Sequence, residues 1–203
     1  MKLIFINSCE DISSLNDCFV GRTDVPLTDN GMFQTIMLGE YFSRNVKVTK
    51  IISSPLERAV YTARFLQSYF PNVQLGIDEN IIEMDGGLWE DLPFSEILGK
   101  YSDIFINLYK NTQLYAPDGE AMENVYSRAE KFVSGIKHEE NAVVVVIAHQ
   151  IILKNILCRL IKNDISKLAE IEKLKSGSIT EFLIDNDEII LNKFNWIEHL
   201  GND

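Results

Sequence analysis

Cysteine and long hydrophobic runs are scarce in this sequence of 203 residues. The three cysteines, Cys9, Cys18 and Cys158, are too few for a disulfide framework, and none belongs to a C-x-x-C pair. No cluster of His, Cys and Asp residues has the spacing of a metal site, so we expect neither a metal nor another cofactor. The longest apolar run, residues 142–148, is too short to span a bilayer, which argues against a membrane protein.

Basic residues are also fewer than acidic ones. Lys and Arg number 19 and Asp and Glu number 30, so the formal net charge is 19 − 30 = −11. An acidic surface opposes long-range attraction to nucleic acid and to anionic lipid, although a local basic pocket could still bind an anion. The apolar N-terminal stretch reaches polar Asn7 too soon for a signal peptide, and with so few cysteines we expect a cytoplasmic location.

The hydrophobic pattern predicts an α/β fold in one domain. Short apolar runs indicate buried strands over residues 3–6, 48–52, 73–77 and 142–148. Helical spacing indicates helices over residues 31–41, 56–69, 94–109, 122–136 and 151–161. Residues 7–29 are expected to form a long loop, and residues 177–194 a hairpin around Asn186-Asp187. Strands that alternate with helices predict a three-layer α/β/α arrangement with a mostly parallel sheet.

Polar residues follow three of the predicted strands. Asn7-Ser8-Cys9-Glu10 comes after the first, Ser53-Ser54-Pro55 leads from the second to Arg58, and His149 follows the strand at 142–148. In open α/β sheets, ligands bind beyond the carboxyl ends of the strands. A cation and an imidazole at neighbouring strand ends, each beside a helix N-terminus, favour a site for an anion.

Five motifs occur in a specific order along the chain. They are Gly21-Arg22-Thr23-Asp24-Val25-Pro26-Leu27-Thr28, Ser53-Ser54-Pro55-Leu56-Glu57-Arg58-Ala59, Glu83-Met84-Asp85-Gly86-Gly87-Leu88-Trp89-Glu90, Pro117-Asp118-Gly119-Glu120 with Arg128, and Ala148-His149. In this order they resemble the signatures of the histidine phosphatase (phosphoglycerate mutase-like) superfamily. The resemblance implies a single domain over residues 1–203, with residues 81–120 as a lid-like insertion over the pocket, and is compatible with a homodimer.

The resemblance also implies roles for individual residues. Arg58 and His149 would bind the ligand, Glu83 would donate a proton to the leaving group, and Arg22 would lie near the phosphate entrance. Aromatic residues of the lid segment are expected mainly in its own core, and any that reach the pocket would suit a ligand with an apolar part. These residues are Trp89, Phe94, Phe105, Tyr109 and Tyr115.

One part of the family pattern is different here. Members of the family carry Arg-His-Gly-Glu after the first strand, and its histidine attacks phosphorus; counting back from Gly21 places Asn7, Ser8, Cys9 and Glu10 at these positions. The usual asparagine of the following loop falls on Ser14. A serine hydroxyl is a weak nucleophile without a base, and an asparagine cannot replace the charge of an arginine.

We therefore expect a degenerate site, a pseudoenzyme candidate without conventional phosphatase or mutase activity. It would bind a phosphorylated or other anionic small molecule through Asn7, Ser8, Ser14, Arg22, Arg58 and His149.

Two enzymatic alternatives stay open. In the first, the pocket is a repurposed enzyme for ester, thioester or phosphoester chemistry. His149 would be its acid or base, Ser8 or Cys9 its nucleophile, and Glu83 a nearby carboxylate. In the second, the chain is an ordinary phosphatase or mutase, which would require His149 itself to act as the nucleophile.

Overall fold

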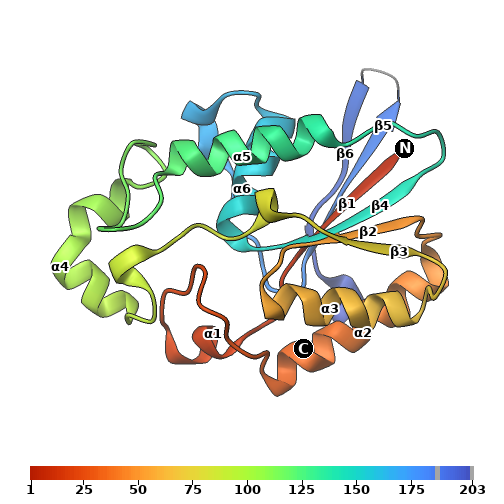
Figure 1. The fold of residues 1–203 in the computed structure, drawn as a ribbon, viewed down its shortest axis with the longest axis horizontal. Coiled ribbons are helices and arrows are strands. Elements are labelled where there is room, and N and C mark those ends of the chain that lie inside the picture. The colour runs from red at the N-terminus through yellow and green to blue at the C-terminus, as the bar shows by residue number, and fades with distance from the viewer. Residues whose placement is uncertain (186–187, 202–203) are drawn as a thin grey trace.

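The computed structural model describes residues 1–185 and 188–201, and a six-stranded sheet is its central element (Figure 1). The strands are β1 (Lys2–Asn7), β2 (Lys50–Ser53), β3 (Gln74–Ile77), β4 (Val143–Ala148), β5 (Ile179–Asp185) and β6 (Glu188–Trp196). They lie in the order β3-β2-β4-β1-β5-β6. The first four strands in this order are parallel, whereas β5 and β6 run antiparallel to their neighbours.

Helices cover both faces of the sheet, which confirms the predicted three-layer α/β/α class (Figure 1). On one face α2 (Asp29–Asn45) and α3 (Glu57–Ser68) pack over a core that includes Ile4, Ile51 and Ile147. On the other face α5 (Met122–Gly135) and α6 (Gln150–Ile161) cover a second core. Because β4 is buried on both sides, its sequence is an uninterrupted apolar run.

The register of the parallel strands determines where the site lies. Asn7 at the end of β1 pairs with Ala148 at the end of β4, and Ser53 at the end of β2 pairs with Ile147. The segments that follow these three strands therefore leave the sheet at one edge. This is the edge at which the sequence predicted an anion site.

The remaining helices are short or lie away from the sheet. In Figure 1, α4 (Phe94–Asn107) forms an arm at some distance from the strands, and α1 (Ile12–Asn16) follows β1. Short 3₁₀ helices are η1 (Glu79–Ile81), η2 (Gly87–Trp89), η3 (Ile165–Glu170) and η4 (Glu198–Leu200). No helix within residues 1–185 and 188–201 is long and apolar enough to cross a membrane.

One local prediction was wrong, because residues 7–29 are not a continuous loop. Asp11 caps α1 by accepting hydrogen bonds from the backbone N–H groups of Ser13 and Ser14. A five-residue helix has no hydrophobic periodicity to reveal it, so only the capping aspartate marks it in the sequence. The hairpin strands are confirmed as β5 and β6, while the predicted turn at Asn186-Asp187 lies outside the described residues.

Candidate active site

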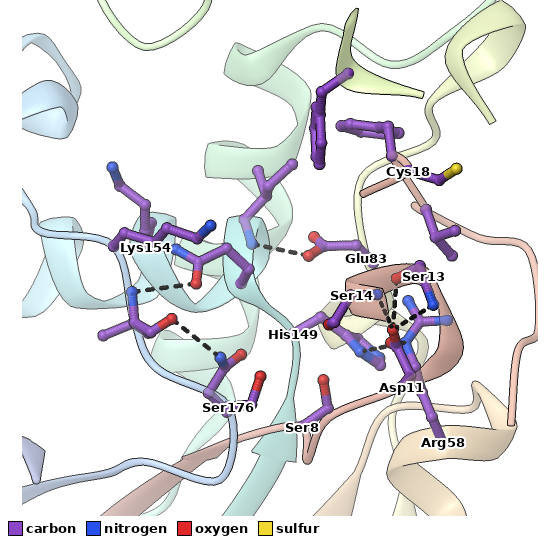
Figure 2. Close-up of a pocket in the computed structure, with 18 of the residues that line it drawn as sticks. Ser8, Asp11, Ser13, Ser14, Cys18, Arg58, Glu83, His149, Lys154 and Ser176 are labelled. Carbon is purple, nitrogen blue, oxygen red and sulfur yellow. Dashed lines mark hydrogen bonds and ion pairs between the residues drawn. The ribbon is translucent and has the colours of Figure 1, made fainter. Parts of the chain in front are cut away.

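A cavity of about 460 Å³ opens beyond the carboxyl ends of β1 and β4 (Figure 2). Seven of the candidate ligand-binding and catalytic residues named from the sequence line it, namely Asn7, Ser8, Cys9, Ser14, Arg58, Glu83 and His149. Arg22 does not line it. The Arg22 guanidinium instead pairs with Asp85 and Glu120 and donates to the backbone carbonyl of Glu83.

Arg58 is the central cation of this cavity. It lies in the first turn of α3 and is only 3% exposed. Its two terminal nitrogens donate to the carbonyl oxygens of Gly21, at 2.7 Å, and Thr23, at 2.9 Å. Each terminal nitrogen of an arginine carries two hydrogens, so a second N–H on each can still meet an oxyanion. The 21–23 loop thus fixes the guanidinium in one orientation without neutralising its charge.

The carboxylate of Asp11 would compete with a bound anion for the positive charge of Arg58. The Oδ2 atom of Asp11 lies 3.6 Å from Nε of Arg58, while its Oδ1 atom caps α1. Asp11 was not among the site residues predicted from the sequence, although its position directly after residues 7–10 marks it as a candidate N-cap close to the end of β1. An anion that binds Arg58 must therefore tolerate, or displace, this ion pair.

His149 is held between Arg58 and a serine. Its Nδ1 atom accepts a hydrogen bond from Nε of Arg58 at 3.2 Å, and its Nε2 atom lies 2.7 Å from Oγ of Ser54. Because a guanidinium N–H can only donate, Nδ1 must be unprotonated and Nε2 carries the proton. Burial, followed by the charges of Arg58 and Arg128, lowers the pKa of His149 well below its ordinary value, so the ring is neutral.

The hydroxyl that forms the hydrogen bond with the His149 ring belongs to Ser54. Ser8, the nucleophile of the repurposed-enzyme alternative, lines the same cavity as His149. Ser54 stood in the quoted Ser-Ser-Pro motif and was not singled out, because spacing alone does not tell which of several nearby hydroxyls meets a ring.

Glu83 is a buried carboxyl, 3% exposed, beside the start of α6. Its Oε1 accepts from the backbone N–H of Met84 and of Ile152, and its Oε2 accepts from that of Ile151 at 2.8 Å. Burial raises the pKa of Glu83 and outweighs these hydrogen bonds and the charge of Arg58, which act in the opposite direction. A raised pKa favours the protonated carboxyl, which is the form that can donate a proton to a leaving group.

Ser8 and Cys9 have different surroundings. The Ser8 side chain is half-buried and lies beside Ser176 in the cavity, where the backbone N–H of Gly177 donates to the Ser8 carbonyl oxygen (Figure 2). The Cys9 thiol is 1% exposed and lies 3.3 Å from the Thr35 hydroxyl. Burial raises the pKa of Cys9 to about 11, so almost no thiolate exists at neutral pH. This environment argues against Cys9 as a nucleophile.

Asn7 and Ser14 have supporting positions at the edge of the cavity. The Asn7 side-chain amide donates to the backbone carbonyl of Lys175 at 3.1 Å, which ties the end of β1 to the segment before β5. Ser14 belongs to α1 and donates its backbone N–H to Asp11. Neither side chain supplies a charge to the cavity.

The outer wall of the cavity is apolar. Phe94, Phe105, Leu108 and Tyr109, all from the 81–120 segment, line it together with Phe19. Trp89 is instead fully buried and packs edge-to-face against Phe19 and Phe105. Three of the aromatic residues named from the sequence therefore reach the cavity.

Comparison with known proteins identifies relatives along almost the whole chain. The sequence model of the histidine phosphatase superfamily (branch 1) matches residues 10–197. Phosphoserine phosphatase 1 of Hydrogenobacter thermophilus is 27% identical over 99% of this chain and 95% of its own length. A second protein of that organism is 31% identical over 98% of this chain and 97% of its own.

Solved structures agree with these sequence matches. A phosphoserine phosphatase mutant from Entamoeba histolytica, in complex with phosphoserine, superimposes with a TM-score of 0.82 at 25% identity and 98% coverage of both chains. The α-ribazole phosphatase of Shigella flexneri has the same fold, with a TM-score of 0.85 at 22% identity over 97% of this chain and 96% of its own.

These findings correct the expectation of a degenerate, non-enzymatic binding protein. Relatives that match nearly the whole chain are named as phosphatases, so the expected absence of conventional phosphatase activity was wrong. The expectation inferred the loss of a reaction from three residues, Asn7, Ser8 and Cys9, and gave less weight to the motifs that the rest of the chain shares with the family.

Proposed function

The chain belongs to the histidine phosphatase superfamily (branch 1), and from this premise we propose that it hydrolyses the phosphomonoester of a small molecule. The observation that carries the proposal is the presence of Arg58 and Glu83 in one cavity. Arg58 offers fixed donors and a buried positive charge to a phosphate. Glu83, whose pKa is raised by burial, offers a proton to the departing alcohol.

Ser8 is the proposed nucleophile. We infer that Asn7, Ser8 and Cys9 occupy the positions at which other family members carry Arg-His-Gly, so Ser8 follows β1 where the attacking group is expected. Ser8 lines the cavity with Arg58. Cys9 lines it as well, but its thiol is only 1% exposed and lies against the Thr35 hydroxyl. A serine needs a base to take its proton, and the carboxylate of Asp11 lines the same cavity.

The reaction then consists of two displacements. In the first, Oγ of Ser8 bonds to phosphorus as the bond from phosphorus to the leaving oxygen breaks. The Ser8 proton passes to Asp11, and the Glu83 proton passes to the leaving alcohol. In the second, water attacks phosphorus and gives its proton to Glu83, while the departing Ser8 oxygen recovers its proton from Asp11. Alcohol and inorganic phosphate leave, and each side chain regains its starting state.

The other residues act through these groups. His149 accepts from Arg58 and so orients the guanidinium, and an acid or base role for its ring would require one of its two hydrogen bonds to open. Asn7 and Ser14 shape the edge of the phosphate site. Residues 81–120 act as a lid-like insertion whose apolar side chains exclude water from the reacting atoms.

The names of the relatives support a phosphorylated small molecule as substrate, and phosphoserine is the first compound to test. Release of inorganic phosphate from phosphoserine and from p-nitrophenyl phosphate should be measured for the wild type and for Ser8→Ala. Ser176→Ala is the matched control, because Ser176 is the neighbouring hydroxyl of the same cavity.

We expect wild-type turnover, its loss by at least about a hundredfold in Ser8→Ala, and near-normal turnover in Ser176→Ala. Absence of phosphate release from every phosphomonoester by the folded wild type would overturn the proposed function. Normal turnover in Ser8→Ala would overturn only the role of Ser8.

A further inference from the structure

Lys154 is a buried cation of the cavity that the steps above do not use. It lies on α6, one turn after the residues that bind Glu83, and is 6% exposed. Its Nζ atom lies 4.0 Å from the centre of the Tyr109 ring. In Figure 2 Lys154 lies on the far side of the cavity from Arg58 and Asp11, with Glu83 and His149 between them in this view.

Within residues 1–185 and 188–201, no carboxylate forms an ion pair with Lys154, and its polar contact is the face of the Tyr109 ring. Burial lowers the pKa of Lys154, which reflects the cost of desolvating an ammonium group with no anionic partner. Buried lysines are rare unless they are paired.

Arg58 and Lys154, the two buried cations of the cavity, have different surroundings. Arg58 is fixed by backbone carbonyls and presents a planar group that suits the oxygens of a phosphate. Lys154 presents one compact charge against the ring of Tyr109, and the apolar side chains of Phe105 and Leu108 line the same cavity. A substrate that spans the cavity from Arg58 would place its far end against this lysine.

We infer that Lys154 is a specificity-determining residue, which binds a carboxylate at the end of the substrate remote from the phosphate. The inference rests on the proposed function and narrows the substrate class to small phosphorylated carboxylic acids. A single ammonium matches the single charge of a carboxylate, and the ring of Tyr109 holds the lysine in place from the other side.

A matched pair of compounds tests this inference. Phosphoserine and phosphoethanolamine both carry a phosphate and an ammonium group, and they differ only by the carboxylate. The ratio of kcat/KM for the two compounds should be measured for the wild type, Lys154→Met, Lys154→Arg and Lys173→Met, with p-nitrophenyl phosphate as a general reference. Lys173 is the control because it is an exposed lysine at the rim of the same cavity.

The wild type should prefer phosphoserine by about 10- to 100-fold, the range expected for a charged hydrogen bond. The ratio should fall close to one in Lys154→Met, be partly restored in Lys154→Arg, and stay at the wild-type value in Lys173→Met. A preference that survives in Lys154→Met, or a wild-type ratio near one, would overturn the inference while leaving the phosphatase proposal intact.

Failure of the proposed function can be distinguished from failure of the inference about Lys154. If the wild type releases phosphate from no compound, the proposed function fails, and calorimetric binding of the same two compounds then decides on Lys154. Tighter binding of phosphoserine by the wild type, lost in Lys154→Met, would support the carboxylate site. Equal binding of both compounds, or binding of neither, would refute it.

Discussion

Replacing Glu83 by glutamine removes the proposed proton donor and keeps the shape of the side chain. General acids contribute about 10²- to 10⁴-fold to a rate, so hydrolysis of an alkyl phosphate should fall by a factor in this range. p-Nitrophenolate leaves without protonation, and its phosphate ester should lose less than about tenfold. The predicted signature is therefore a dependence on the leaving group rather than a uniform loss.

The structure also sets the cost of Glu83→Gln in stability. Glu83 accepts hydrogen bonds from the backbone N–H groups of Met84, Ile151 and Ile152. A glutamine has one acceptor oxygen, so at least one of these buried donors loses its partner, at a cost of about 1–3 kcal/mol. For a chain of this length, a loss of about 2 kcal/mol lowers Tm by roughly 4–8 °C.

The pH dependence of stability and of activity is a second test of the role of Glu83. The pKa of Glu83 is higher in the folded protein than its ordinary value of 4.5, so the folded state favours the protonated form. The stabilisation from this proton is complete below about pH 4.5 and is lost as the pH rises through the folded-state pKa. The free energy of unfolding of the wild type, relative to Glu83→Gln, should therefore decline across that window. Activity on alkyl phosphates should fall over the same range.

Glu90→Gln is the matched control for these measurements. Glu90 also accepts from backbone N–H groups, those of Gly21, Arg22, Thr23 and Gly86, but it does not line the cavity. Burial raises the pKa of Glu90, yet these hydrogen bonds outweigh burial and the pKa lies below its ordinary value. The control should lose stability without a dependence on the leaving group. Equal losses on alkyl and aryl phosphates in Glu83→Gln would refute the role of Glu83 as the acid.

Further predictions concern the residues around Arg58. Asp11→Asn retains a helix-capping side chain but removes the negative charge 3.6 Å from Arg58, so tungstate, measured by calorimetry, should bind at least about fivefold more tightly while turnover falls. Weaker binding of tungstate would contradict the interpretation that Asp11 competes with the anion for Arg58. Cys9→Ala should keep turnover within about twofold of the wild type, because the pKa of Cys9 is raised to about 11 and its thiol lies against Thr35. A loss comparable to that of Ser8→Ala would show instead that the thiol takes part in the reaction.

The sequence predicted the edge of the sheet at which the cavity lies, because apolar runs and helical spacing are read directly from it. It also brought Arg58, Glu83 and His149 together, since each lies at a strand end or in a family motif. It did not predict that His149 binds Ser54, because the direction of a side chain depends on packing between distant segments.

Two buried charged residues of the cavity, Asp11 and Lys154, were missed for related reasons. Asp11 caps a helix too short to show periodicity, and its approach to Arg58 depends on how that helix folds back on the strand ends. Lys154 interrupts an apolar helix, a pattern that a sequence reading can detect but cannot connect to a cavity. Their positions became evident only when α1 and α6 were placed at the same edge.

Mass spectrometry of the enzyme after rapid quenching tests the central claim most directly. The protein would be mixed with excess phosphoserine and quenched within one turnover. One portion would be quenched in acid, which preserves a phosphoserine, and another in denaturant at mildly alkaline pH, which preserves a phosphohistidine, and both would be digested to peptides. The account predicts a phosphoryl group on the peptide that contains Ser8, and its absence in Ser8→Ala. Turnover with the phosphoryl group on another residue, such as His149, would contradict it.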